Sequence, residues 1–106
     1  MDEFKKSIEM VGVMLTDHLF ALRSSFKYAR TIDELDKVHD DMIVLKEIAV
    51  ATLYKMCEPL VYITPETVEL IILRDKYVRE INSICDALER LDDTRYIQLK
   101  NKGVNR

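Results

Sequence analysis

Residue types that do chemistry are sparse in this chain, and the tightest group of them is Asp36, His39 and Asp40. On a helix these side chains would share one face, at positions i, i+3 and i+4, where an imidazole and two carboxylates could surround a metal ion. The helix dipole also favours carboxylates in the first turns of a helix, which accounts for the same residues without a ligand. We therefore predict no metal site.

The remaining candidates for catalysis have ordinary structural explanations. His18 falls between Leu15 and Leu22, so we expect it to be a structural histidine at the edge of the core. The polar cluster that comes closest to an enzyme site comprises Arg74, Asp75, Arg79 and Glu80. Oppositely charged side chains at this spacing are typical of a solvated helix face, which is the interpretation we adopt.

Short motifs that carry reaction chemistry are missing from the sequence. It contains no Gly-rich phosphate loop and no G-x-S-x-G, C-x-x-C or H-E-x-x-H motif. Neither His18 nor His39 follows a glutamate by three residues, as the carboxylate-rich di-iron bundles require. We expect no catalytic residues and no cofactor, and a protein that is not an enzyme.

The composition is that of one folded domain. The chain has 106 residues, of which 48% are hydrophobic and 33% charged, far from the pattern of disordered chains. Its net charge of -3, with both signs interspersed, offers no basic field for a nucleic-acid backbone. Nucleic acid is therefore not an expected partner, unless another protein brings it.

Neither a leader nor a membrane anchor is expected. Residues 10–22 are the most apolar stretch, but Thr16, Asp17 and His18 interrupt them. The two cysteines, Cys57 and Cys85, have no need to pair in a domain with an ample apolar core, and we expect reduced, buried thiols. These features predict a soluble cytoplasmic protein.

Long helices are favoured by the presence of only two glycines and two prolines. The first helix is predicted over residues 2–29, with acidic residues at its start and basic residues toward its end. Its apolar side chains recur every three or four residues and form one stripe: Ile8, Val11, Leu15, Leu19, Leu22, Phe26 and Ala29.

The second helix is predicted to start at Thr-Ile-Asp-Glu, residues 31–34, a capping box in which hydroxyl and carboxylate each accept a backbone N–H. Pro59 disfavours helical geometry at the preceding residue and ends the run. The apolar stripe between these limits is Leu35, Val38, Met42, Leu45, Ala49, Thr52 and Met56.

The third helix is predicted to open with Thr64 as N-cap and Pro65 at its first position, with Ile63 and Val68 spaced as a hydrophobic staple. Its stripe is Leu70, Leu73, Tyr77, Ile81, Ile84, Leu88 and Leu91. Two aspartates, residues 92 and 93, either end this helix or let it continue to about residue 100.

Three helices of about 27 residues with short connections predict an all-α fold. We expect an up-down-up antiparallel bundle of three long helices, completed by dimerisation. Residues 1–100 would form the single domain, and residues 101–106 a frayed C-terminal tail.

More apolar surface is present than one bundle can bury. Helix one carries apolar side chains all round, and a second copy or another protein could cover them. The residues predicted for a partner or dimer interface are Met10, Gly12, Val13, Met14, Phe20, Tyr54 and Tyr62. The alternative is a wide core-facing stripe in a compact monomer. The apolar connector at residues 58–63 is expected to fold over the end of the bundle as a plug, or else to contact a partner through Tyr62.

One short segment resembles a known family. Residues 31–38, TIDELDKV, are similar to the T-I-D-x-L-acidic-basic-V segment of the Hha family. Members of that family are small helical modulators that act by binding nucleoid-associated proteins. The resemblance covers eight of 106 residues and implies a regulator that works by contacting another protein. A capping box followed by a heptad helix produces the same pattern.

The sequence therefore predicts a protein–protein interaction module of bacterial or phage type, a homodimer that acts as a small regulator, adaptor or inhibitor of a partner protein. A first alternative is a secretion or assembly chaperone that shields an apolar client helix. A second is a nucleic-acid-associated transcriptional modulator. Its only direct support is the basic residues Arg23, Lys27, Arg30, Lys100, Lys102 and Arg106.

Overall fold

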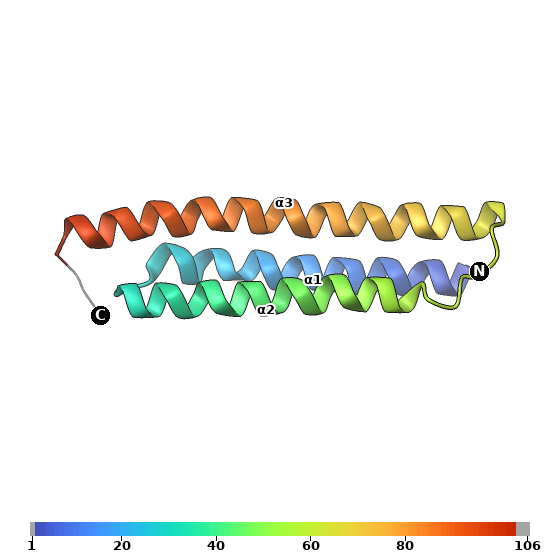
Figure 1. Ribbon diagram of the computed structural model, residues 1–106, viewed down its shortest axis with the longest axis horizontal. Helices are drawn as coiled ribbons and strands as arrows, with labels where there is room; N and C mark the ends of the chain where they lie inside the picture. Colours follow the sequence, from blue (N-terminus) through green and yellow to red (C-terminus); the bar gives the residue numbers. More distant parts are fainter. Residues whose placement is uncertain (1, 104–106) are drawn as a thin grey trace.

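The computed structural model describes residues 2–103 and places nearly all of them in three helices. These are α1 (Asp2–Tyr28), α2 (Ile32–Met56) and α3 (Pro65–Asn101), packed into a rod of 58 × 18 × 15 Å (Figure 1). Each helix packs against both of the others. The prediction of an all-α three-helix bundle is confirmed.

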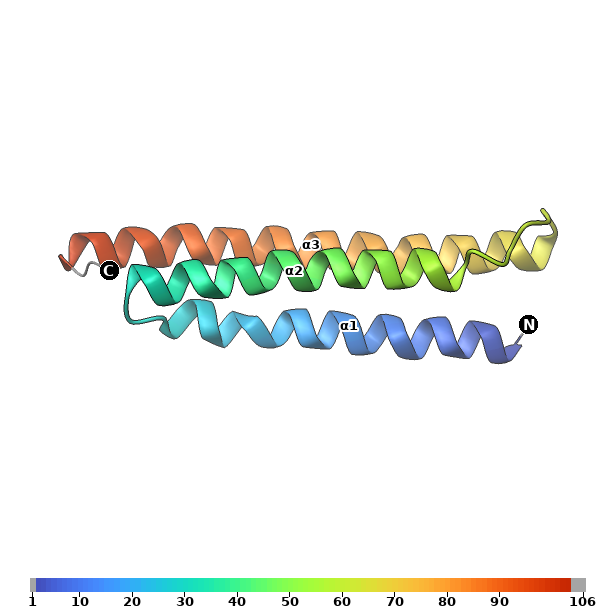
Figure 2. The ribbon, with the colours of Figure 1, turned by 60° about the horizontal axis from the view of Figure 1, so that its bottom comes forward.

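The chain changes direction at each of its two connections. Figure 1 shows the link from α1 to α2 at one end of the rod and the link from α2 to α3 at the other. Residues of α1 and α3 meet in the same order along the rod, since Gly12 lies against Tyr77 and Ala29 lies beside Arg95. Figure 2 shows α1 along one edge of the bundle, below α2 and α3.

Helix α1 follows its predicted bounds to within one residue. Asp2 and Glu3 lie in its first turn and Lys27 in its last, so the charges complement the helix dipole. Its buried residues, at helical spacing, are Ile8, Gly12, Leu15, Leu19 and Phe26. This stripe attaches α1 to the rest of the bundle.

Helix α2 begins as expected but with one changed hydrogen bond. Thr31 is its N-cap, and the Thr31 hydroxyl accepts the backbone N–H of Glu34 at 3.1 Å. The Glu34 carboxylate accepts the backbone N–H of Arg30 at 2.7 Å, one residue before the cap that a capping box would satisfy. The helix ends at Met56, just before Pro59.

Helix α3 is longer than its predicted minimum. Thr64 is the N-cap and Pro65 the first residue, and Thr67 completes a reciprocal capping box with Thr64. The helix continues through Asp92 and Asp93 to Asn101, the first residue of the segment predicted as a tail. Residues 104–106 of that predicted tail lie outside the described residues.

The core lies between the three predicted stripes. Every member of each stripe is buried or partly buried. Three further side chains are fully buried although the stripes omit them: Leu53, Cys85 and Leu99. Ile43, Val50 and Val78, which the stripes also omit, pack partly against the core, so the apolar excess is smaller than expected. None of the three helices between residues 2 and 103 is both long and apolar enough to cross a membrane.

The connector between α2 and α3 does not plug the bundle. Tyr62 is 78% exposed and Ile63 is 92% exposed, and among residues 58–63 only Leu60 packs partly against the core. The expected plug is therefore wrong, and so is the staple between Ile63 and Val68. The physical reason is the Thr64 cap. The Thr67 hydroxyl donates to the carbonyl of Tyr62 at 2.7 Å, and this extended turn leaves the apolar side chains in solvent.

Candidate protein-interaction surface

Helix α1 presents a second apolar face opposite its buried stripe. At 100° per residue, Met10 lies roughly 180° around the helix from the fully buried Leu19. Met10 is 69% exposed, and Val13 and Met14 are each 49% exposed. Because α2 and α3 pack on the other side of α1, these three side chains face away from the bundle. We call this outward side of α1 the outer face.

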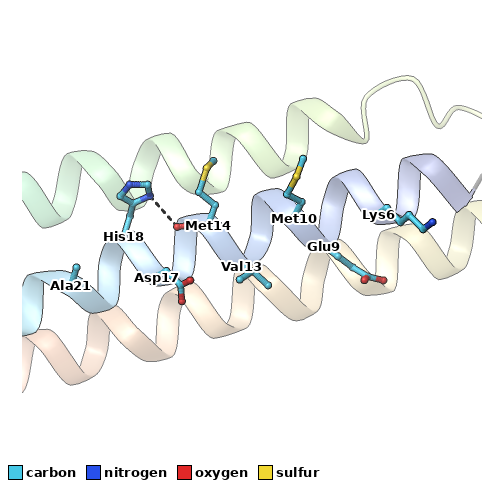
Figure 3. A pocket seen from close by; sticks show the side chains of 8 residues that line it. All are labelled: Lys6, Glu9, Met10, Val13, Met14, Asp17, His18 and Ala21. Carbon is cyan, nitrogen blue, oxygen red and sulfur yellow. Dashed lines mark hydrogen bonds between the residues drawn. The ribbon is translucent and has the colours of Figure 1, made fainter.

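The outer face contains an open depression with charged ends. Figure 3 shows Lys6 toward the start of the helix and Asp17 toward its end, with Met10, Val13 and Met14 between them. The residues that line it are Lys6, Glu9, Met10, Val13, Met14, Asp17, His18 and Ala21. All of them come from α1.

His18 belongs to this exposed surface, so its expected place at the edge of the core is wrong. Its Nδ1 lies 3.0 Å from the carbonyl oxygen of Met14, one turn earlier, and donates to that oxygen (Figure 3). This hydrogen bond is local to α1. His18 follows Asp17 directly in the sequence, and Asp17 lies on the same side of α1 as Met10.

The other predicted interface residues lie at the edge of the outer face or away from it. Gly12 is buried beneath the ring of Tyr77 and reaches no surface. Phe20 is 57% exposed and borders the groove between α1 and α3. Tyr54 lies on α2, where Arg74 of α3 stacks over its ring at 4.3 Å. With Tyr62 in the connector, the predicted set is divided among several regions.

Charged residues of the outer face were missed by the sequence interpretation, which considered only apolar side chains. Lys6, Met10, Val13, Asp17 and Phe20 follow one another at steps of four and three residues. This second periodicity on the same helix is a signal that could have found Lys6 and Asp17. The apolar stripe that enters the core is the more regular pattern on this helix, so the sequence interpretation followed that stripe and overlooked the charged residues.

Within the Asp36, His39 and Asp40 group, His39 contacts a residue of α3. His39 Nε2 lies 3.1 Å from Oε1 of Glu89 on α3, so its partner comes from a distant part of the sequence. Burial raises the pKa of Asp92 above its usual 3.8, against the attraction of His39, and the neighbouring carboxylate Asp93 raises it further. Within residues 2–103, no three His, Cys, Asp or Glu side chains are placed to hold a metal ion.

The second polar cluster is organised by Arg74. Its guanidinium donates two hydrogen bonds to Oδ1 of the adjacent Asp75, at 2.9 and 2.8 Å, so the pair is between neighbours rather than one turn apart. Arg79 and Glu80 remain exposed. Arg74 therefore joins α3 to α2 through its stack on the ring of Tyr54, while Asp75 holds its guanidinium.

Both cysteines are free and buried, as the sequence predicts. Burial raises the pKa of the Cys57 thiol, which Arg74 opposes, and burial likewise raises the pKa of the Cys85 thiol, which Lys46 opposes. A raised pKa lowers the fraction of reactive thiolate. Neither residue has the electropositive, accessible setting of a catalytic cysteine.

The basic residues that would support nucleic-acid binding gather at one end of the rod, but acidic residues accompany them. Arg95 Nε donates to the carbonyl of Ala29 at 2.9 Å, which brings the last turns of α3 beside the end of α1. The first turn of α2, with Asp33 and Glu34, starts at this same end. Arg106 lies outside the described residues.

The short resemblance to the Hha family has a local explanation in the fold. Thr31 caps α2, and Leu35 is buried in the core at the first position of the α2 stripe. These are the capping and heptad positions that the resemblance shares. No family model, no curated protein and no solved structure matches this chain.

Proposed function

We propose that this protein is a protein–protein interaction module, without enzymatic activity of its own, that acts as a small regulator, adaptor or inhibitor. We further propose that it forms a homodimer through the outer face of α1, which completes an up-down-up antiparallel bundle. The observation that carries the proposal is the exposure of Met10, Val13 and Met14 within two turns of α1, opposite its buried stripe.

Burying the outer face would be favourable. Removing apolar surface from water contributes about 25 cal/mol per Å², and methionine side chains adapt to the shape of a partner. Lys6 and Asp17 border the apolar residues and supply a polar rim of the kind that surrounds interface centres. A helix with two apolar faces separated by charged residues is suited to pack on both sides.

The outer side of α2 is a weaker candidate. Val44 and Ile48 are 55% and 54% exposed, but they lie on α2 rather than on α1. Neither residue lines the depression on the outer face of α1. These two residues therefore provide matched controls, since they are apolar, helical and about as exposed as Val13.

The test compares Met10→Asp with Ile48→Asp by light scattering over a wide range of protein concentration. We expect a dimer for the unmodified chain and for Ile48→Asp, and a monomer that keeps its helical content for Met10→Asp. A monomer at every concentration for the unmodified chain would refute dimerisation. A dimer that survives Met10→Asp but not Ile48→Asp would move the interface to α2.

A chaperone that shields an apolar client helix is the second candidate, and the exposed connector favours it. Val61, Tyr62 and Ile63 are three consecutive apolar residues in solvent. In a chaperone the apolar surface stays open until a client binds. A monomer that binds an apolar fluorescent dye strongly, and loses that binding in Tyr62→Ser, would support this candidate over the dimer.

A further inference from the structure

We propose that two copies of this chain pack α1 against α1 in opposite directions, so that Lys6 of each copy meets Asp17 of the other and Met10 meets Val13. The inference rests on the proposed homodimer and specifies its direction and register. The juxtaposition that carries it is a positive and a negative side chain at opposite ends of one exposed apolar patch on a single helix.

The spacing of the outer face is that of a helix pairing seam. Lys6, Met10, Val13, Asp17 and Phe20 are separated by steps of four, three, four and three residues. Alternating steps of this kind place side chains on one narrow seam, at the a and d positions of a heptad. In an antiparallel pair each a residue faces a d residue of the second helix. Met10 and Val13 then flank the symmetry axis.

The charges select the direction of pairing. Neither Lys6 nor Asp17 forms an ion pair with another residue of the described chain, so both are available to a second copy. A parallel pair would place Lys6 against Lys6 and Asp17 against Asp17, which is repulsive. An antiparallel pair creates two Lys6–Asp17 contacts by symmetry.

The ends of the helix favour the same direction. Asp2 and Glu3 occupy the first turn of α1, while Arg23 and Lys27 lie in its last two turns. Opposite directions bring the acidic end of one copy toward the basic end of the other, and they also align the two helix dipoles favourably.

Neighbouring registers are less favourable. A shift of one heptad in one direction places Asp17 against Val13 of the second copy and leaves the carboxylate beside an apolar side chain. A shift in the other direction places Val13 against Glu3 and Lys6 against Met10. The first of these shifts also places Met10 against Phe20, but only the proposed register pairs Lys6 with Asp17.

The first test reverses the charges. In low salt, Lys6→Glu alone and Asp17→Lys alone should each raise the dissociation constant of the dimer on the order of tenfold, because two attractive contacts become repulsive. The double variant, Lys6→Glu with Asp17→Lys, should return the constant to within about threefold of the unmodified value. Added salt should reduce these differences. All of these side chains are exposed, so folding is unaffected.

The second test uses disulfide crosslinking and measures direction without relying on charge. Chains with Lys6→Cys, mixed with chains carrying Asp17→Cys, should form a mixed disulfide on mild oxidation. In the proposed register two Lys6 positions lie about 16 Å apart along the axis, too far for the roughly 6 Å between bridged Cα atoms. Lys6→Cys alone should therefore not crosslink. The native thiols are buried and do not compete.

The outcomes separate the two proposals. A dimer with charge rescue and the mixed crosslink supports the antiparallel register. If neither charge reversal changes the dissociation constant and Lys6→Cys alone forms a crosslink, the proposed register is wrong but the homodimer is still supported. A chain that remains monomeric at every concentration overturns the homodimer, and the register with it.

Discussion

The ring of Tyr77 in α3 lies directly against the backbone of Gly12 in α1. A Cβ atom built at Gly12 would lie 2.6 Å from Cδ2 of that ring and closer still to Cγ, at the base of the side chain. Tyr77 is buried, so its ring has little room to move away. The absence of a side chain at Gly12 therefore permits the close contact of the two helices, and the glycine serves the fold rather than a partner.

The replacement Gly12→Ala should therefore destabilise the protein. Alanine in the middle of a helix normally stabilises by about 1 kcal/mol relative to glycine. Here overpacking against Tyr77 should outweigh that gain and lower the free energy of unfolding by about 1–3 kcal/mol. Urea denaturation followed by circular dichroism measures the difference. Ser24→Ala, at an exposed position of α1, is the control and should cost nothing; a stabilised Gly12→Ala would contradict the contact.

Arg95 of α3 satisfies the end of α1. Its Nε donates to the carbonyl of Ala29 at 2.9 Å, and its Nη1 donates to Oε1 of Gln98 at 3.0 Å. Removing this charged donor in Arg95→Ala should lower the free energy of unfolding by about 1–2 kcal/mol. The exposed Arg90→Ala on the same helix should change it little. Equal thermal stabilities for both variants would show that the contact contributes nothing.

Asp92 should make the free energy of unfolding depend on pH in the acidic range. Because burial raises its pKa in the folded state above the usual 3.8, the folded chain holds this proton more tightly than the unfolded chain. Its contribution to stability is therefore fully present below 3.8 and is lost as pH rises through the raised folded pKa. Asp92→Asn should be more stable than the unmodified chain at neutral pH, and acidification should remove the difference. Denaturation at several pH values measures it, with the exposed Asp93→Asn as control. If the difference in stability between Asp92→Asn and the unmodified chain stayed the same at every pH, it would contradict the raised pKa of Asp92.

The two thiols should react only when the chain unfolds. Cys57 and Cys85 are buried, and burial raises both pKa values, so accessible thiolate is scarce in the folded protein. An aromatic disulfide reagent should label them slowly in buffer and completely in denaturant. Rapid labelling of one thiol per chain without denaturant would show that its helix opens readily.

Phe20 extends the outer face toward α3. In the proposed antiparallel pair it lies opposite Glu3 of the second copy, so Phe20→Asp would place two carboxylates against each other. The dissociation constant of the dimer should rise by tenfold or more, on the order of 1.4 kcal/mol, while the thermal stability of the bundle stays nearly unchanged. Sedimentation analysis measures the first quantity. An unchanged dimer would exclude Phe20 from the interface.

Several features were predictable from the sequence because their causes are local. Thr31 and Thr64 start helices because their hydroxyls accept nearby backbone N–H groups. Pro59 lies just beyond the end of α2 because proline opposes the helix before it. The three core stripes follow from helical periodicity, which depends only on residue spacing.

The plug, the staple and the place of His18 could not be derived in this way. The exposure of Ile63 depends on the path of the chain through the Thr64 cap, not on how apolar Ile63 is. His18 has apolar neighbours in sequence, but its angle on α1 directs it outward. The residue pattern of a segment shows how hydrophobic the segment is. It does not show which way the chain turns, and so it does not show which side chains are exposed.

The sequence by itself determined three helices, where they start and which stripes are apolar, since caps and periodicity act over a few residues. Only the tertiary structure decided that Gly12 receives Tyr77 and that Arg95 reaches Ala29. Those outcomes join residues far apart in the chain. They depend on how three helices share one core, which residue spacing along a single helix does not specify.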